Sequence, residues 1–298
     1  MVVVMTIVFV ALRLGPIDPA QYVLGEYATD ETLRKLRETM ELDHPIYVQY
    51  LHFVYRIIRG DFGTSFLNNL SVLSQLLDVL PYTLELLIGG ILIGILVGVP
   101  PGIVAALKPN SIFDQMIRIF TLTWIAIPVF VTGIFLITIF SLKLNLLPAI
   151  GGGEHGELAS HLLHLILPAF SCGFFMMASI ARLIRASLLD VLTKDYIMTA
   201  RSKGLRESVV ILKHALRNSL LPLISFLGIY VNILLGSAVI LEVIFTRPGI
   251  GRLIVESIKN GDFPMVQTII MFYGGAVVIV NLLVDVAYCL VDPRIVYK

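Results

Sequence analysis

Five long stretches without a charged side chain constrain the fold of this 298-residue chain more than any other feature. They cover residues 86–107, 119–142, 158–181, 218–241 and 263–284, and each contains 22 or 24 residues. A helix of about 20 apolar residues crosses the roughly 30 Å hydrocarbon core of a bilayer. Only helices and closed barrels span lipid, and the stretches lack the alternating pattern of barrel strands. We therefore expect five transmembrane helices.

The composition agrees with a membrane protein. Hydrophobic residues make up 57% of the chain and charged residues 14%, whereas soluble domains average about 45–50% and about 25%. The two cysteines are far apart in the sequence and form no metal-binding or disulfide pattern. An ordinary soluble enzyme is excluded.

A sixth apolar stretch, residues 1–14, is interrupted only by Arg13. At about 1.5 Å per residue it spans roughly 21 Å, which is short for a crossing. It lacks the basic start and the small-residue cleavage site of a signal peptide. We expect the outer end of a first transmembrane helix, with a reading frame that continues upstream by about 10–15 residues. A short helix in a locally thinned bilayer is the alternative.

The distribution of lysine and arginine predicts the orientation. Segments 108–118, 182–217 and 285–298 carry twelve of these residues, whereas segments 143–157 and 242–262 carry four. Basic residues favour the cytoplasmic side of a membrane. We therefore expect a multi-pass protein of the bacterial inner membrane, with residues 182–217 and the C-terminus in the cytoplasm and residues 15–80 outside.

The outer segment 15–80 carries two helix patterns of its own. Thr29 and the acidic residues after it can begin a polar helix that ends near Met40. From 46 to 58 apolar and aromatic residues recur at helical spacing after Pro45. Such a tyrosine-rich helix either packs on the transmembrane bundle or forms a docking surface for an extracytoplasmic partner.

Two further patterns lie near or within the membrane. Glycine recurs at every fourth position of the stretch 86–107, which favours close packing with another helix; these residues are Gly90, Gly94, Gly98 and Gly102. Three histidines gather before and within the stretch 158–181, namely His155, His161 and His164. They are weak metal candidates because no second cluster completes a site, and packing is the favoured interpretation.

The basic connector between the third and fourth charge-free stretches carries the strongest functional signal. Asp195 can cap a short helix, Gly204 suits the left-handed position that ends it, and a second helix pattern follows. A plain connection would need only a few residues. We therefore expect residues 186–220 to form an ordered cytoplasmic element with a role of its own.

The residues of this element resemble the coupling segment, of the type known as EAA, in permeases of binding-protein-dependent ABC importers. Within that family the chain is similar to the peptide and nickel branch. The matching coupling residues are Asp195, Tyr196, Thr199, Ala200, Arg201, Lys203, Gly204 and Leu205, followed by His214-Ala215-Leu216-Arg217-Asn218. Further similar motifs are Gly60-Asp61-Phe62-Gly63, His164 to Ala169, Glu242 to Gly251 and Asp292-Pro293-Arg294.

The resemblance implies an all-α permease of the type I ABC importer fold, with six transmembrane helices in a single domain 1–298. It implies a second permease subunit, two ATPase subunits that bind ATP and magnesium, and an extracytoplasmic solute-binding protein. The chain contains no Walker A motif, so we expect no cofactor and no ATP hydrolysis on it. Short peptides are the expected substrate, with nickel chelates, metallophores or glutathione as alternatives.

Two functions of other classes predict different sequences. A secondary transporter would show an internal repeat and a site for ions at the middle of the membrane. An intramembrane enzyme would show a paired catalytic set inside the bilayer. Neither pattern is visible in the sequence.

Overall fold

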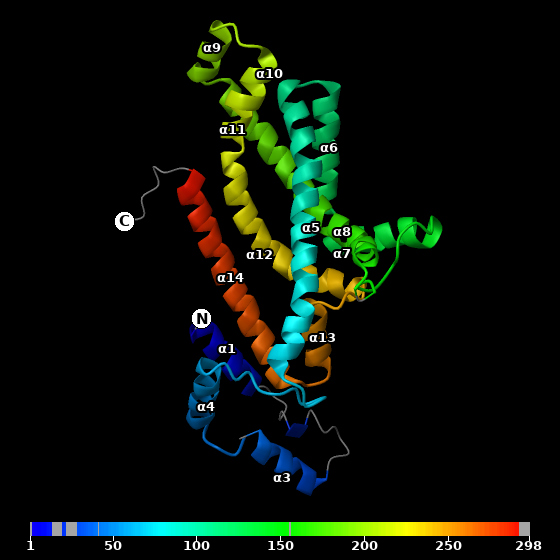
Figure 1. The fold of residues 1–298 in the computed structure, drawn as a ribbon, viewed down its shortest axis with the longest axis vertical. Helices are drawn as coiled ribbons and strands as arrows, with labels where there is room; N and C mark the ends of the chain where they lie inside the picture. Colours follow the sequence, from blue (N-terminus) through cyan, green and yellow to red (C-terminus); the bar gives the residue numbers. More distant parts are fainter. Residues whose placement is uncertain (1, 14–19, 22–28, 41, 155, 292–298) are drawn as a thin grey trace. The chain divides into compact units, whose positions relative to one another are not determined.

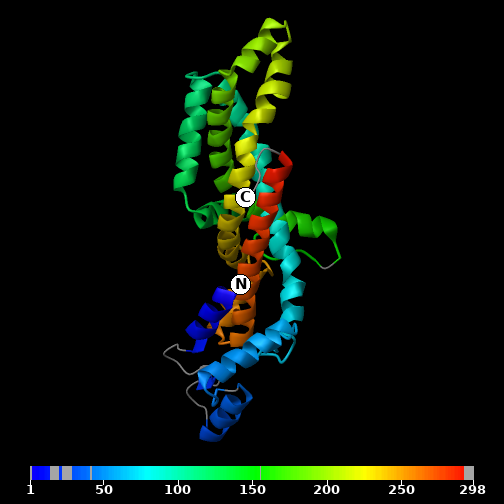
Figure 2. The ribbon, with the colours of Figure 1, turned by 90° about the vertical axis from the view of Figure 1, so that its left-hand side faces the viewer.

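The computed structural model describes residues 2–13, 20–21, 29–40, 42–154 and 156–291. Their regular elements are helices, drawn in Figure 1 and, after a quarter turn, in Figure 2. The chain forms two compact units. Unit 1 contains residues 1–81 and 248–278, and unit 2 contains residues 82–247 and 279–298.

Unit 2 is a bundle around one central helix, α8 (Leu158–Leu192). Most of its inward side chains are buried, including Met176, Ile180 and Ile184. Helix α8 packs against α6, α7 and α12; the two views agree that α6 runs beside it (Figure 1, Figure 2). The helices of this bundle are α5 (Val72–Leu107, from residue 82 in this unit), α6 (Ile112–Ala126), α7 (Val129–Leu136), the π-helix η1 (Ile137–Lys143), α8 (Leu158–Leu192) and α12 (Leu221–Ile244).

Four of the expected transmembrane stretches lie in helices that are long and apolar enough to cross a membrane. These helices are α5, α8, α12 and α14, the last spanning Phe263–Val291. The short apolar helix Val2–Ala11 lies within α1 (Val2–Arg13), where a first crossing was expected. The described residues thus give four full-length spans, or five if a bent pair of helices is counted as one.

The expectation of one continuous helix over 119–142 is wrong. Helices α6 and α7 meet at a bend of 101°. Ile127 is extended (φ −85°, ψ 122°) and Pro128 follows it. A proline disfavours the helical conformation of the residue before it and has no N–H for the helix ladder. The break therefore follows from Pro128.

Unit 1 is built from two stretches that lie far apart in the sequence. Its apolar core joins Val72 and Leu76 to Ile250, Met265 and Ile269. Its helices are α1, α3 (Asp30–Thr39), α4 (Ile46–Ile58), α13 (Ile250–Lys259), the first turns of α5 and the first half of α14. The two helices expected in the outer segment are therefore confirmed, and α5 begins inside the segment 15–80.

Helix α4 packs one face against α1 within unit 1. The Tyr50 ring meets Phe9 edge to face at 5.3 Å, and its hydroxyl lies 2.6 Å from the Thr6 hydroxyl. Another stripe of the helix exposes Tyr47, Leu51, Tyr55 and Ile58. An exposed apolar stripe of this kind is typical of a surface that meets another molecule or the membrane interface.

Candidate functional site

The connector between α8 and α12 folds as a compact helical element at one end of unit 2 (Figure 1). Its members are α9 (Asp195–Ser202), α10 (Glu207–Val209), the π-helix η2 (Val210–Ala215) and α11 (Leu216–Ser219). The sequence-based expectation of two helical parts on either side of Gly204 is confirmed.

Gly204 ends the first helix as the sequence predicts. Its φ of +73° lies in the left-handed region, and its N–H donates to the Arg201 carbonyl at 2.9 Å. The expectation for Asp195 is wrong, because Lys194 is the N-cap residue and no side chain caps the helix. Asp195 is instead the first residue of α9, where the positive end of the helix dipole stabilises its negative charge.

The inner face of the element packs on the end of α8. Ile197, Ala200, Val210 and Ala215 are buried in one apolar cluster with residues of α8 such as Leu188. Ala200 is only 7% exposed, and its small side chain packs within this cluster. The other seven residues singled out from the sequence are exposed: Asp195, Tyr196, Thr199, Arg201, Lys203, Gly204 and Leu205.

Polar contacts hold the turn around Gly204. The Arg201 guanidinium donates to both carboxylate oxygens of Glu207 at 2.7 and 3.2 Å. The hydrogen bond lowers the pKa of Glu207 and raises that of Arg201, so the pair stays ionised at neutral pH. Asn218 donates to the Tyr196 hydroxyl at 2.9 Å and ties α11 to α9.

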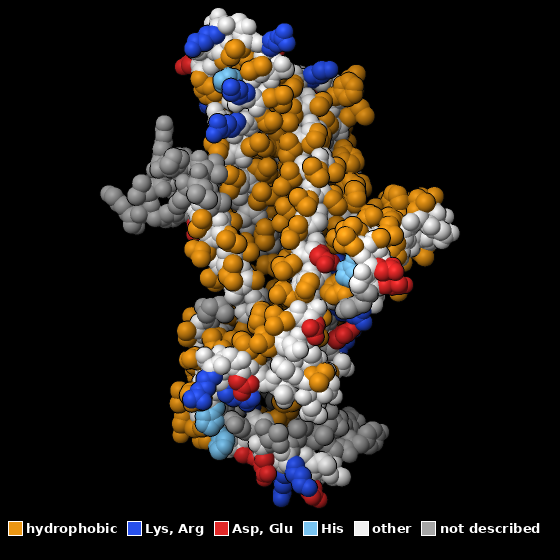
Figure 3. Space-filling view, viewed as in Figure 1, with side chains coloured by type: hydrophobic (Ala, Val, Ile, Leu, Met, Phe, Trp, Pro, Cys, Tyr) orange, Lys and Arg blue, Asp and Glu red, His pale blue; other side chains and the backbone are white. Residues whose placement is uncertain are grey.

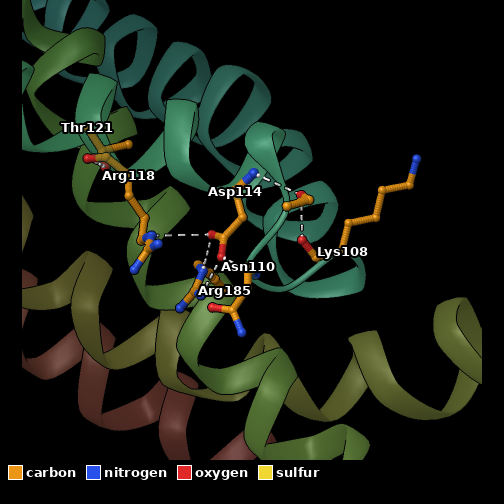
Figure 4. A network of polar contacts seen from close by, with 7 residues as sticks. Lys108, Asn110, Asp114, Arg118, Thr121 and Arg185 are labelled. Carbon is orange, nitrogen blue, oxygen red and sulfur yellow. Dashed lines mark hydrogen bonds and ion pairs between the residues drawn. The ribbon is translucent and has the colours of Figure 1, made fainter.

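A buried ion pair connects α6 to the same end of α8 (Figure 4). Asp114 is fully buried, and its two oxygens accept from Arg185 Nε at 2.6 Å and Nη2 at 2.8 Å. It also accepts from the Asn110 N–H at 2.9 Å, and Arg118 lies 3.7 Å away. Sequence reasoning missed this pair. Its signal was the spacing Ser111-x-x-Asp114 before an apolar run, a helix-capping pattern that the structure bears out.

The glycine stripe of α5 faces α8. A Cβ on Gly90, Gly98 or Gly102 would lie 2.6–2.8 Å from atoms of α8, and one on Gly94 would lie 3.0 Å from Met176. Contacts under 3.0 Å are too close for real side chains, so glycine permits the approach of these two helices.

A second polar cluster lies at the opposite end of unit 2 from α9. Arg247 is completely buried; it donates to Glu85 at 2.5 Å and to the Tyr82 carbonyl at 3.3 Å. Removal from water lowers the pKa of Arg247. His161 stacks on the Tyr82 ring at 5.1 Å. No periodic pattern in the sequence pointed to Arg247.

The histidine candidates have other partners. His161 lies 3.7 Å from Glu85, and His164 Nδ1 lies 2.8 Å from the Ser160 carbonyl. His155 lies outside the described residues. Among the residues that the structure describes, no three His, Cys, Asp or Glu side chains gather as a metal would need.

Comparison with known families decides the class. The family described as binding-protein-dependent transport system inner membrane component matches residues 72–297. The chain belongs to this permease family. A related family for the N-terminal part of such membrane components matches residues 1–87.

Relatives of the permease cover nearly its whole length. It is 38% identical over 291 residues to a probable peptide ABC transporter permease protein, y4tP, of Sinorhizobium fredii, with 97% of this chain and 93% of that protein covered. It is 35% identical over 296 residues to the glutathione transport system permease protein GsiC of Escherichia coli K12, with 99% and 94% covered. The permease is therefore a component of an ABC importer, in the peptide and nickel branch.

Solved structures support the fold of the permease. A chain of the MetNI methionine ABC transporter, in an inward-facing conformation, superposes with a TM-score of 0.57 at 18% identity, covering 73% of this chain and 96% of that one. A chain of an amino acid ABC transporter gives 0.54 at 16% identity, with 72% and 93% covered. The permease thus has the type I ABC permease fold. It is a transport subunit and not an enzyme; ATP is hydrolysed on separate ATPase subunits of such importers.

Proposed function

We propose that this permease forms half of a translocation path for short peptides, and that α9 with the turn at Gly204 couples it to an ATPase subunit. The observation that carries the coupling role is the compact element α9–α11. It buries one face on α8 and leaves seven of the eight residues singled out from the sequence exposed. A connector that only joins two spans needs neither a packed core nor a turn at positive φ.

The contacts within unit 2 give the proposed coupling a physical route. The apolar cluster under α9 joins it to the last turns of α8, and the Asp114–Arg185 pair joins α8 to α6. A displacement of α9 would therefore move α8 and α6 together. When two ATPase subunits close on ATP and magnesium, we expect this movement to change access to the path.

The proposed assembly contains a second permease subunit, two ATPase subunits and an extracytoplasmic solute-binding protein. The C-terminus and α9–α11 lie in the cytoplasm in this arrangement, as the distribution of lysine and arginine suggests. The relatives named above favour peptides, with glutathione as the second candidate. Uptake of labelled dipeptide, glutathione and nickel by cells with and without the permease gene separates them. Loss of glutathione uptake alone would overturn the peptide assignment.

Gly204→Trp tests the coupling role. We expect loss of transport with normal membrane insertion, because the indole would stand on the exposed turn and Trp resists positive φ. Gly156→Trp is the matched control, since Gly156 also has positive φ (+86°) and, like Gly204, no atom within 4 Å of an added Cβ. Transport by Gly204→Trp at the control level, with the ATPase still co-purifying, would contradict the coupling role.

A further inference from the structure

An apolar groove with a basic rim lies beside the coupling element in unit 2. Its volume is about 1020 Å³, which is at the upper end of the range for pockets that hold small ligands. The apolar walls come from α5 and α12, with Leu96 and Leu221 both exposed. The rim comes from η2 and α11, with Lys213, His214 and Arg217.

The three basic side chains of the rim have no partner among the described residues. No hydrogen bond or ion pair joins Lys213, His214 or Arg217 to any of them, and the described lining contains no acidic residue. Figure 3 shows Lys and Arg side chains gathered over α9–α11, with many hydrophobic side chains along α5 and α12. The groove therefore presents positive charge that nothing described in this chain neutralises.

Polarity changes in one direction along the groove. Along the chain, the basic residues 213–217 come first, Asn218 follows, and leucine and isoleucine line the groove from Leu220 to Leu227. A phospholipid has the same order, with a charged head group followed by apolar chains. Basic pockets between transmembrane helices on the cytoplasmic side suit anionic lipid head groups.

We propose that this groove binds an anionic phospholipid of the inner leaflet, with its phosphate at Lys213 and Arg217 and its acyl chains along α5 and α12. The proposal rests on the cytoplasmic orientation given under the proposed function. A path for a polar solute would need polar groups along its walls, and the walls here are apolar. A helix of another subunit could cover the walls but would have to supply acidic groups for Lys213 and Arg217.

Lipid retention tests the proposal without a transport assay. The assembled complex is placed in nanodiscs of phosphatidylcholine and phosphatidylglycerol, three to one, and bound lipids are counted by native mass spectrometry. Lys213→Gln should weaken phosphatidylglycerol retention about fivefold, and Lys213→Gln with Arg217→Gln about 30-fold. Lys108→Gln is the control, because Lys108 lies over the Phe113 ring outside the groove. Equal retention by all variants, or equal retention of phosphatidylcholine, would overturn the proposal.

A photo-crosslinking amino acid at Leu96 identifies the occupant directly. An adduct with the mass of phosphatidylglycerol supports the proposal, and an adduct with the second permease overturns it. Both readouts are independent of the Gly204 experiment. If the variants retain lipid equally but Gly204→Trp abolishes transport, the lipid proposal is overturned and the coupling role stands.

Discussion

Asp114 lies buried at the start of α6, where Arg185, Arg118 and the Asn110 N–H all direct positive charge or a hydrogen toward it. Removing one partner of a buried ion pair leaves the other charge without compensation and typically costs about 3–5 kcal/mol. We expect Asp114→Ala to lower the free energy of unfolding by about that amount, measured by thermal unfolding of the purified permease.

Asp190→Ala is the matched control for this experiment. Asp190 lies on α8 and pairs with Lys194 at 3.0 Å, but its side chain is 67% exposed. Exposed pairs contribute about 0–1 kcal/mol. Equal destabilisation by the two variants would show that the buried Asp114–Arg185 pair contributes no more to the free energy of unfolding than an exposed pair.

At the scale of elements, the packing of α5 on α8 depends on the absence of side chains at the glycine stripe. We expect Gly98→Ala to destabilise the permease by about 1–3 kcal/mol, because its Cβ would lie 2.8 Å from the Met177 carbonyl oxygen. Gly236→Ala on α12 has nothing within 4 Å of the added Cβ. It should be neutral or stabilising, since alanine favours a helix over glycine. Thermal unfolding that ranks the two variants in the opposite order would refute the packing role.

The exposed stripe of α4 tests the role of the outer segment. Tyr47, Leu51 and Tyr55 are exposed, so replacing all three with serine should spare the fold. We expect the triple variant to lose the stimulation of ATPase activity by the loaded binding protein, because that partner would lose its apolar contact. Leu67→Ser with Leu70→Ser, both exposed in the following loop, is the control. Stimulation that survives the triple change would assign the stripe to the membrane surface instead.

At the scale of the whole molecule, orientation is the property on which the coupling role depends. We expect Thr29→Cys to react with a membrane-impermeant maleimide on intact cells, and Ser202→Cys to react only after permeabilisation. Cys172 is buried and should stay unlabelled, while Cys289 is replaced by serine in this background. Labelling of Ser202→Cys on intact cells would reverse the topology.

The sequence predicted features that depend on local pattern. Charge-free length located α5, α8, α12 and α14, and the positive φ of Gly204 followed from its place between two helix patterns. It did not predict features that depend on distant partners. Arg247 reads as one more charge in a connector, yet it is buried against Glu85, 162 positions away. Arg185 reads as a positive-inside residue, yet it pairs with Asp114, 71 positions away.

Pro128 is an intermediate case. Its effect on the helix is local, but a proline inside a transmembrane stretch can be accommodated by neighbouring groups. The sequence alone therefore did not decide between a tolerated kink and the 101° bend that the structure has.

The Ser65–Asp262 hydrogen bond, at 2.5 Å, joins residues 197 positions apart in unit 1. A ribosome that adds about 5–20 residues per second needs roughly 10–40 s to make the second partner after the first. During that interval Val72 and Leu76 have emerged, while Ile250, Met265 and Ile269, which cover them in the finished core, do not yet exist. Until then this apolar surface must be shielded from water by the translocon, by lipid or by a chaperone. Variants that slow synthesis between these segments should therefore increase the fraction of the permease that membrane proteases degrade.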